Sequence, residues 1–393
     1  VNRNYAYRLY PNRRQAQLLD RVLEIHRQLY NAALQERRDA WRMCRVSLNY
    51  CAQANQLKAI RQFDQDSAWL NYSSIQQTLR RLDKAFAAFF RRIRAGDQPG
   101  YPRFKSKRRF NSVQYRWGDG IRLKANRLHI QNVGTVKVKW HRPLPENATM
   151  KCAYLKRDGA HWYAIIALEL PDATSAPHPG RAVGLDVGLY SMVALSDGTV
   201  IENPRLFRIA ETKLADAQRI LSRRVKFSGR WRKQAALVAS LHRKIANQRR
   251  DFAHKLSRRL AATYALIGVE DLNIMALSRS PLAKSVHDAG WSQLLSLLAY
   301  KVENTGSQLV AVDPRHTSQR CSECGAHVQK ELSVRVHVCS DCGLTLDRDV
   351  NAARNILALA LLLAPVAQAQ VNLTARTEPS AFEPRSRRVY ATE

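Results

Sequence analysis

Acidic residues are scarce in this sequence: 32 Asp and Glu stand against 64 Lys and Arg, which leaves a formal net charge of +32 over 393 residues. Enzymes that act on small cytosolic molecules have no reason to carry such an excess. A basic surface on this scale indicates a polyanionic partner such as nucleic acid. The excess is spread, with 33 basic and 13 acidic side chains in residues 1–180 and 31 and 19 in residues 181–393. We therefore expect an extended contact surface.

Long apolar runs are also missing. The most apolar run, residues 356–367, is too short to cross a membrane and contains Pro365. The start of the sequence does not have the pattern of a cleavable signal peptide. We therefore expect a soluble, cytoplasmic protein without a membrane partner, which associates with the nucleoid if its cell is prokaryotic.

Cysteines are few, but four of the seven form two Cys-x-x-Cys pairs, each followed by glycine. Two such pairs separated by fourteen residues are typical of a zinc ribbon, in which four thiolates close a tetrahedral shell around one structural Zn²⁺. Spacing alone also permits disulfides or an iron–sulfur cluster. The predicted zinc ligands are Cys321, Cys324, Cys339 and Cys342, and the other three cysteines, Cys44, Cys51 and Cys152, are predicted to be ordinary core residues.

The first part of the chain has a helical pattern after a short strand. Residues 3–10 have strand character up to Pro11, and residues 12–96 follow helical spacing. One apolar stripe in this region is interpreted as the core of a helical bundle rather than as a platform for stacking bases. Its members are Trp69, Leu79, Leu82, Phe86, Phe89 and Phe90.

Residues 97–117 form a loop rich in aromatic and basic residues, and residues 112–170 then alternate as short strands. Aromatic rings among Arg and Lys suit contacts to phosphates and stacking on exposed bases, although a merely solvated basic loop remains the alternative. A Pro/Ala/Ser-rich linker places a domain boundary at about 175–181. The candidate nucleic-acid contacts are Tyr101, Arg103, Phe104, Lys105, Lys107, Arg108 and Arg109.

Acidic residues interrupt two apolar strands in the second half. Asp186 lies in the strand and turn pattern of residues 182–200, and Glu270 lies near the end of the strand at 265–272. A carboxylate in such a strand is costly unless it is paired or holds a metal. Asp347 and Asp349 begin a later helix, where simple capping is the alternative role. Together these acids predict a Mg²⁺ or Mn²⁺ site with two ions for phosphodiester hydrolysis.

Helices are predicted between these strands along the sequence. Residues 207–264 are predicted to form two long helices broken near Gly229, and residues 221–260 contain thirteen Lys and Arg against a single acid. Such a basic helix face suits contacts with the phosphates of a nucleic-acid strand. A further helix at 288–304 and a strand at 307–312 complete the alternation that is expected of an α/β core.

Several motifs together resemble the TnpB family, RNA-guided nucleases encoded by insertion-sequence transposons and similar to the ancestors of type V CRISPR effectors. The resemblance runs from residue 1 to about 360, and no catalytic motif departs from the family pattern. The motifs are GLDVG at 184–188, VEDL at 269–272, TSQR at 317–320 before the four cysteines, DRDVNAARNI at 347–356, YPRFKSK at 101–107 and DFAHKL at 251–256.

The resemblance implies a multidomain α+β protein with an RNase H-like RuvC nuclease core. Its catalytic, magnesium-binding triad maps onto Asp186, Glu270 and Asp349, because in the family the third acid directly precedes the segment that here is Val350-Asn351-Ala352. Residue spacing alone leaves Asp347 as a competitor. The implied segments are a β wedge domain (1–11 and 97–175), a helical recognition domain (12–96), the nuclease core (181–313), a zinc ribbon (314–345), a final core helix (346–360) and a flexible tail (361–393).

The resemblance also implies the partners and the reaction. A transposon-derived guide RNA pairs with one strand of target double-stranded DNA, which is cut next to a short motif. We expect a monomer on one guide, because a core within one chain needs no partner to complete its site. Three alternatives remain: a catalytically silent RNA-guided repressor, an RNase H-like transposase, and a zinc-ribbon binder without chemistry, which would leave Asp186 and Glu270 unexplained.

Overall fold

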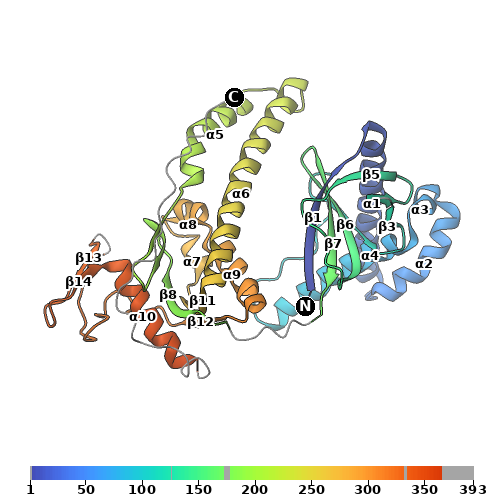
Figure 1. Cartoon of the computed structure of the whole chain (residues 1–393). Helices are drawn as coiled ribbons and strands as arrows, with labels where there is room; N and C mark the ends of the chain where they lie inside the picture. Colours follow the sequence, from blue (N-terminus) through green and yellow to red (C-terminus); the bar gives the residue numbers. More distant parts are fainter. Residues whose placement is uncertain (1, 125, 172–177, 332–333, 365–393) are drawn as a thin grey trace. The chain divides into compact units, whose positions relative to one another are not determined.

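The structure is a computed structural model that describes residues 2–124, 126–171, 178–331 and 334–364. The chain divides into two compact units, unit 1 at Val1–Ala173 and unit 2 at Thr174–Glu393. Each unit has its own hydrophobic core. Figure 1 shows the helices and strands of each unit. Most of the predicted linker, residues 172–177, and most of the predicted tail, residues 365–393, lie outside the described residues, and the finer domain boundaries stay predictions.

The described part of unit 1 contains a seven-stranded antiparallel sheet with the order β2-β6-β7-β1-β5-β4-β3. The N-terminal strand β1 (Asn2–Tyr10) lies inside this sheet, between β5 (Gly134–Lys139) and β7 (His161–Glu169). The start of the chain therefore completes a sheet whose other strands lie more than a hundred residues away. The remaining strands are β2 (Ser112–Arg116), β3 (Ile121–Lys124), β4 (Arg127–Ile130) and β6 (Thr149–Asp158).

Three of the four helices described in unit 1 begin at asparagines, and the fourth begins at Asp64. Asn12, Asn49 and Asn71 each accept a hydrogen bond from a backbone N–H of the first turn, which supplies a donor that the helix cannot pair internally. The helices are α1 (Arg13–Cys44), α2 (Tyr50–Phe63), α3 (Gln65–Trp69) and α4 (Tyr72–Arg94).

The predicted apolar stripe on α4 is only partly a bundle core. Leu79 and Leu82 are buried, as predicted, but Phe90 at the end of the helix is 50% exposed. The prediction that Cys44 and Cys51 are core residues was also wrong, because both are exposed. Cys44 ends α1 and Cys51 lies in the first turn of α2, so both flank a loop rather than the packed helix face.

Unit 2 is built on a mixed sheet, whose described strands have the order β10-β9-β8-β11-β12. The first three pair antiparallel, whereas β8, β11 and β12 run parallel. Because β8 and β11 are parallel neighbours, their carboxyl ends meet at the same edge. The strands are β8 (Arg181–Asp186), β9 (Ser191–Leu195), β10 (Val200–Glu202), β11 (Tyr264–Glu270) and β12 (Gln308–Val312).

Helices pack on both faces of this sheet. Val183 and Ile267 belong to a core with α6 (Gly229–Thr263) and α9 (Trp291–Thr305), whereas Leu266 packs with Ile356 of α10 (Arg348–Leu363). Two glycines let α10 lie directly on the strands, since a Cβ on Gly184 would fall 1.9 Å from the Ala353 carbonyl oxygen. The other helices are α5 (Leu206–Ser222), α7 (Ile274–Leu277) and α8 (Ala283–Ala289).

The end of unit 2 differs from the sequence expectation in one respect. Helix α10 continues to Leu363, so residues 361–363 are helical rather than part of a tail. Before it, β13 (Val336–Val338) and β14 (Thr345–Asp347) pair as an antiparallel hairpin in the four-cysteine region. Among the helices of the described residues, none combines the length and hydropathy needed to span a membrane.

Candidate active site

Asp186 and Glu270 lie at neighbouring strand ends. Asp186 is the last residue of β8 and Glu270 the last residue of β11, and the register pairs Leu185 with Val269 directly before them. Both side chains are partly exposed. Each follows a buried apolar strand, so the strand packing places two acids at one edge of the sheet.

Asp347 and Asp349 have different surroundings at the start of α10. Asp347 is the N-cap residue, and its Oδ1 accepts from the backbone N–H groups of Asp349 and Val350 at 2.9 and 3.1 Å. Asp349 is only 7% exposed and approaches the turn after β8, since a Cβ on Gly188 would lie 3.7 Å from its Oδ2. The capping interpretation therefore applies to Asp347, and Asp349 is the acid near Asp186.

The surroundings of Asp186 and Glu270 disfavour the charged forms of both carboxyl groups. Partial burial, and then the Glu270 and Asp349 carboxylates, raise the pKa of Asp186 well above its usual range. Burial also raises the pKa of Glu270, while the Thr317 hydroxyl, which donates to Glu270 Oε1, acts in the opposite direction. A carboxyl group whose charged form is disfavoured by neighbouring carboxylates belongs to a donor set that a bound cation would stabilise.

The three carboxylates are not packed around one point. Among the described residues, the four cysteines form the only group of three or more His, Cys, Asp or Glu whose ligand atoms all lie within 4.8 Å of one another. The oxygens of Asp186, Glu270 and Asp349 therefore line a wider site than the compact sulfur cluster. The strand register places Asp186 and Glu270 at neighbouring strand ends, and Asp349 approaches the turn that follows Asp186.

Two arginines near Asp349 were missed by the sequence analysis. Arg335 Nη1 lies 3.7 Å from Asp349 Oδ2, and Arg348 Nε lies 3.5 Å from Oδ1. The Arg335 guanidinium also lies 5.1 Å from the ring centroid of Tyr190, which is 65% exposed beside β9. Arg348 is adjacent to Asp349 in the motif, but nothing in the sequence pattern singles out Arg335.

Two asparagines of α10 join the helix to the cysteine region, and the sequence analysis assigned them no role. Asn351 is fully buried, accepts from the Ser322 N–H at 2.9 Å and donates to the Arg320 carbonyl at 2.8 Å. Asn355 donates to the Thr317 carbonyl at 2.8 Å. These bonds connect the helix that carries Asp349 to the loop whose Thr317 contacts Glu270.

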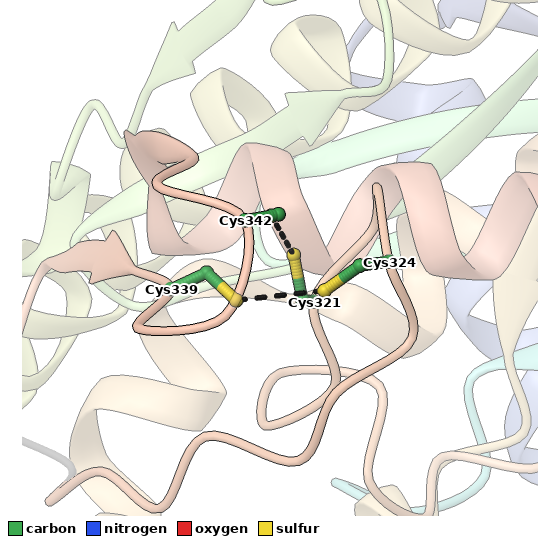
Figure 2. Close-up of side chains that lie close together, drawn as sticks. All are labelled: Cys321, Cys324, Cys339 and Cys342. Carbon is green, nitrogen blue, oxygen red and sulfur yellow. Dashed lines mark hydrogen bonds between the residues drawn. The ribbon is translucent and has the colours of Figure 1, made fainter.

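The four cysteines come together as predicted (Figure 2). Sγ of Cys321 lies 3.6 Å from that of Cys342, and Sγ of Cys324 lies 3.6 Å from that of Cys339. The glycine after each pair has a positive φ, +78° at Gly325 and +73° at Gly343, and its N–H donates to the carbonyl of the first cysteine. Two similar turns thus direct four thiols to one centre, a donor set that fits Zn²⁺.

The candidate nucleic-acid loop is held against helices of unit 1. The Lys105 N–H donates to Asn31 Oδ1 at 2.8 Å, and its carbonyl accepts from Arg27 at 3.1 Å. Tyr101 packs edge-on against Phe86, at 5.6 Å between ring centroids, while remaining 45% exposed. The other predicted contacts, Arg103, Phe104, Lys107, Arg108 and Arg109, are exposed. Their contact with nucleic acid stays a prediction.

Comparison with family models and curated relatives matches most of the chain. The models described as "Probable transposase", "Cas12f1-like, TNB domain" and "Helix-turn-helix domain" match residues 165–280, 291–356 and 1–45. A "Putative RNA-guided DNA endonuclease" from Streptomyces pristinaespiralis is 36% identical over 373 residues, 92% of this chain and 90% of its own. The "Putative RNA-guided DNA endonuclease InsQ" of Escherichia coli (strain K12) is 35% identical over 314 residues, 75% of this chain and 76% of its own.

The fold resembles that of a protein in a solved structure. The protein in "Cryo-EM structure of the Cas12f1-sgRNA-target DNA complex" superposes with a TM-score of 0.57 at 13% identity, covering 91% of this chain and 98% of that one. At this identity the likeness concerns the fold alone. Residues 1–45, matched by the helix-turn-helix model, contain β1 and the single long helix α1 in this structure.

Proposed function

This chain belongs to the TnpB family, and from that premise we propose that it is an RNA-guided DNA endonuclease that cuts target DNA next to a short motif. The placement of Asp186 and Glu270 at neighbouring strand ends, with Asp349 close to the turn after β8, carries the proposal, because a protein that only bound DNA would have no use for acids gathered at one edge of a sheet. The names of its relatives and the net charge of +32 support it.

The proposed nuclease core is RNase H-like, of the RuvC type. Its support is the mixed sheet with the order β10-β9-β8-β11-β12, in which three antiparallel strands are extended by two parallel ones. Asp186, Glu270 and Asp349 are the proposed catalytic residues. Asp347 caps the helix that carries Asp349, which favours Asp349 over Asp347 as the third acid.

The donor set of three carboxylates fits two Mg²⁺ or Mn²⁺ ions. When bound, such ions activate a water and stabilise the leaving oxygen of a phosphodiester. The chain itself orients the ligands. The Thr317 hydroxyl donates a hydrogen bond to Glu270 Oε1, and the Asp347 side chain caps the first turn of α10, which contains Asp349. Arg335 and Arg348 lie beside the Asp349 carboxylate and offset its negative charge.

The proposed partners are a transposon-derived guide RNA and target double-stranded DNA, bound by one copy of the chain. Guide pairing would select the sequence, and the protein would hold the heteroduplex through its backbone. The basic helix α6 supports this, since Arg230, Arg232, Lys233, Lys244 and Arg250 lie on its exposed surface. Phosphate contacts of this kind predict binding that weakens steeply with salt.

The four cysteines are proposed to hold one structural Zn²⁺. We expect one zinc per chain by elemental analysis of the purified protein, and none after Cys321→Ser with Cys339→Ser, because four thiolates are needed to close the shell. The variant with exposed Cys44→Ser is the control and keeps its zinc. Equal zinc in all three proteins would contradict the assignment.

The decisive test is guided cutting. The protein is purified with its RNA from cells that carry its native locus, the RNA is sequenced, and the complex is incubated with matching DNA and Mg²⁺. We expect guide-dependent cutting that Asp186→Ala abolishes, falling by about a thousandfold or more, since metal ions supply several kcal/mol of transition-state stabilisation. Guide-dependent binding without cutting in either protein would instead identify a silent RNA-guided binder. Strand joining would identify a transposase.

A further inference from the structure

An apolar cavity of about 490 Å³ lies in unit 1, where the later turns of α1 and α4 meet the loop that follows α4. Its wall contains five aromatic rings, contributed by α1, α4 and the loop. A volume of this size with a mostly apolar lining is typical of a small ligand site. The rings are those of Trp41, Phe86, Phe89, Phe90 and Tyr101.

The aromatic wall is only half covered by the protein itself. Trp41, Phe90 and Tyr101 are 54%, 50% and 45% exposed, which is unusual for rings that belong to a helical core. Phe89 packs edge-on against Tyr101, with 5.4 Å between ring centroids, so the rings support one another around the opening. A second aromatic ring entering the cavity would bury this remaining surface.

One polar group in the wall lacks a hydrogen-bond partner within the described part of the chain. Arg37 is only 6% exposed, and its Nε donates to Gln53 Oε1 at 2.8 Å while Nη1 donates to Asp83 Oδ1 at 3.1 Å. Its Nη2 is buried without a hydrogen-bond partner among the described residues. An unpaired buried donor on a cation destabilises the protein, so an acceptor atom on a ligand would stabilise this arrangement.

The surroundings of the cavity are positive. Arg91, Arg92 and Arg94 are exposed in the last turn of α4, and Arg42 and Arg45 are exposed at the end of α1. These helix ends are the ones that contribute Phe90 and Trp41 to the wall. Guanidinium groups beside stacking surfaces match a strand whose phosphates stay outside while one base enters.

We propose that this cavity binds one unpaired base of a single-stranded nucleic acid. The base stacks on the aromatic wall, its carbonyl oxygen accepts from Arg37 Nη2, and its neighbouring imino N–H donates to Asp83. Guanine, uracil and thymine have this carbonyl beside an N–H, whereas adenine and cytosine have no imino N–H. This inference rests on the proposed function, to which it adds the recognition of a single base. It is tested by binding alone, without a cleavage assay.

The test uses the full-length protein without divalent metal and end-labelled abasic strands of about 12 nucleotides. Each strand carries one central guanine, one central adenine, or no base, on either a ribose or a deoxyribose backbone. Fluorescence anisotropy gives the dissociation constants. For the wild type we expect guanine to bind about fivefold to a hundredfold more tightly than the base-free strand, and more tightly than adenine.

Variants separate the cavity from the general basic surface. Phe90→Ala and Trp41→Ala, at partly exposed positions, are expected to bind guanine and base-free strands equally. The control Phe63→Ala removes an aromatic ring that is 88% exposed outside the cavity and keeps the preference. Arg37→Lys keeps the charge beside Asp83 but loses the discrimination against adenine.

The backbone series identifies the source of the base. Stronger discrimination on ribose places the base in the guide RNA, and stronger discrimination on deoxyribose places it in a DNA strand; either result supports the site. Equal wild-type binding of strands with and without a base, on both backbones, overturns the proposal. An equal loss in Phe63→Ala and Phe90→Ala overturns it as well, whether or not the protein proves to be a nuclease.

Discussion

His26 in unit 1 and Asp186 in unit 2 are both ionisable side chains whose pKa is shifted by full or partial burial, but their neighbours differ. His26 is fully buried, and its ring nitrogens lie 2.8 Å from the Val22 carbonyl and 3.0 Å from the Ser74 hydroxyl. Asp186 instead faces Glu270 and Asp349, whose charges make its own less favourable. Burial with satisfied partners is typical of a structural residue, whereas burial among like charges is typical of a functional site.

The largest effect is expected from a substitution that forces α10 away from β8 and so separates Asp349 from Asp186. In Gly184→Ala the new Cβ would lie 1.9 Å from the Ala353 carbonyl oxygen and 2.6 Å from the Leu357 nitrogen. Because both atoms belong to a helix backbone, we expect a loss of about 3 kcal/mol or more in the free energy of unfolding and loss of cutting. Urea unfolding and a cleavage assay measure the two effects.

Gly229→Ala is the matched control for this substitution. A Cβ at Gly229 meets nothing within 4 Å, and the residue lies in the first turn of α6. Alanine there should leave cutting unchanged and stabilise the protein by up to about 1 kcal/mol. Equal destabilisation by both substitutions would contradict the close contact of α10 with β8.

Acid should destabilise unit 1 through His26. Burial lowers the pKa of His26 to about 4 from a reference value of 6.5, so the unfolded chain binds a proton at a higher pH than the folded one. This contribution to stability is complete above pH 6.5 and is lost as the pH falls toward 4, by about 1.4 kcal/mol per unit. Urea unfolding followed by tryptophan fluorescence checks it, since five of the seven tryptophans lie in unit 1.

His242→Gln, at an exposed position of α6, is the control and should keep the acid dependence of the parent. His26→Gln should reduce the pH dependence of the free energy of unfolding in the same pH range. A parent protein whose stability is unchanged between pH 6.5 and 4 would contradict the assignment of His26 as a neutral, structural group.

Thr317→Val tests the hydrogen bond that Thr317 donates to Glu270. The valine keeps the shape of the threonine, which is 4% exposed, but removes the hydroxyl that donates to Glu270 Oε1. Since this bond lowers the Glu270 pKa, its loss should shift the acid limb of the cutting rate to higher pH and reduce kcat by about tenfold. An unchanged pH–rate profile would mean that Thr317 only supports the loop.

The smallest effect concerns the stability of the site itself. Asp186→Asn removes one of the like charges, so without metal the variant should melt about 2–4 °C higher than the parent while it fails to cut DNA. The sign follows from the raised pKa of Asp186, because the charged acid destabilises the folded state at neutral pH. Calorimetry in EDTA checks this, and the difference should vanish in acid, where Asp186 is protonated.

Much of the fold was predictable from local patterns. The two strands that carry Asp186 and Glu270 and the helix break near Gly229 agree with the structure, because apolar alternation and a capping serine act over a few residues. The strands end at the two acids, however, whereas the sequence pattern placed Asp186 within its strand and continued the second strand to residue 272. The exposed Phe90 and Cys51 were mispredicted, since periodicity identifies an apolar face but not what covers it. Exposure depends on which distant segments pack there.

The sequence by itself determined the four zinc-ligand candidates, because each Cys-x-x-Cys turn closes within five residues and needs only its glycine to take a positive φ. Only the tertiary structure brought Asp349 close to the turn after β8, placed Arg335 beside Asp349 and left Arg37 Nη2 without a hydrogen-bond partner among the described residues. Each of these depends on side chains from segments far apart in the chain, whose distances are set by the packing of α10 on the sheet or of α1 against α4. Spacing along the chain carries no information on such distances.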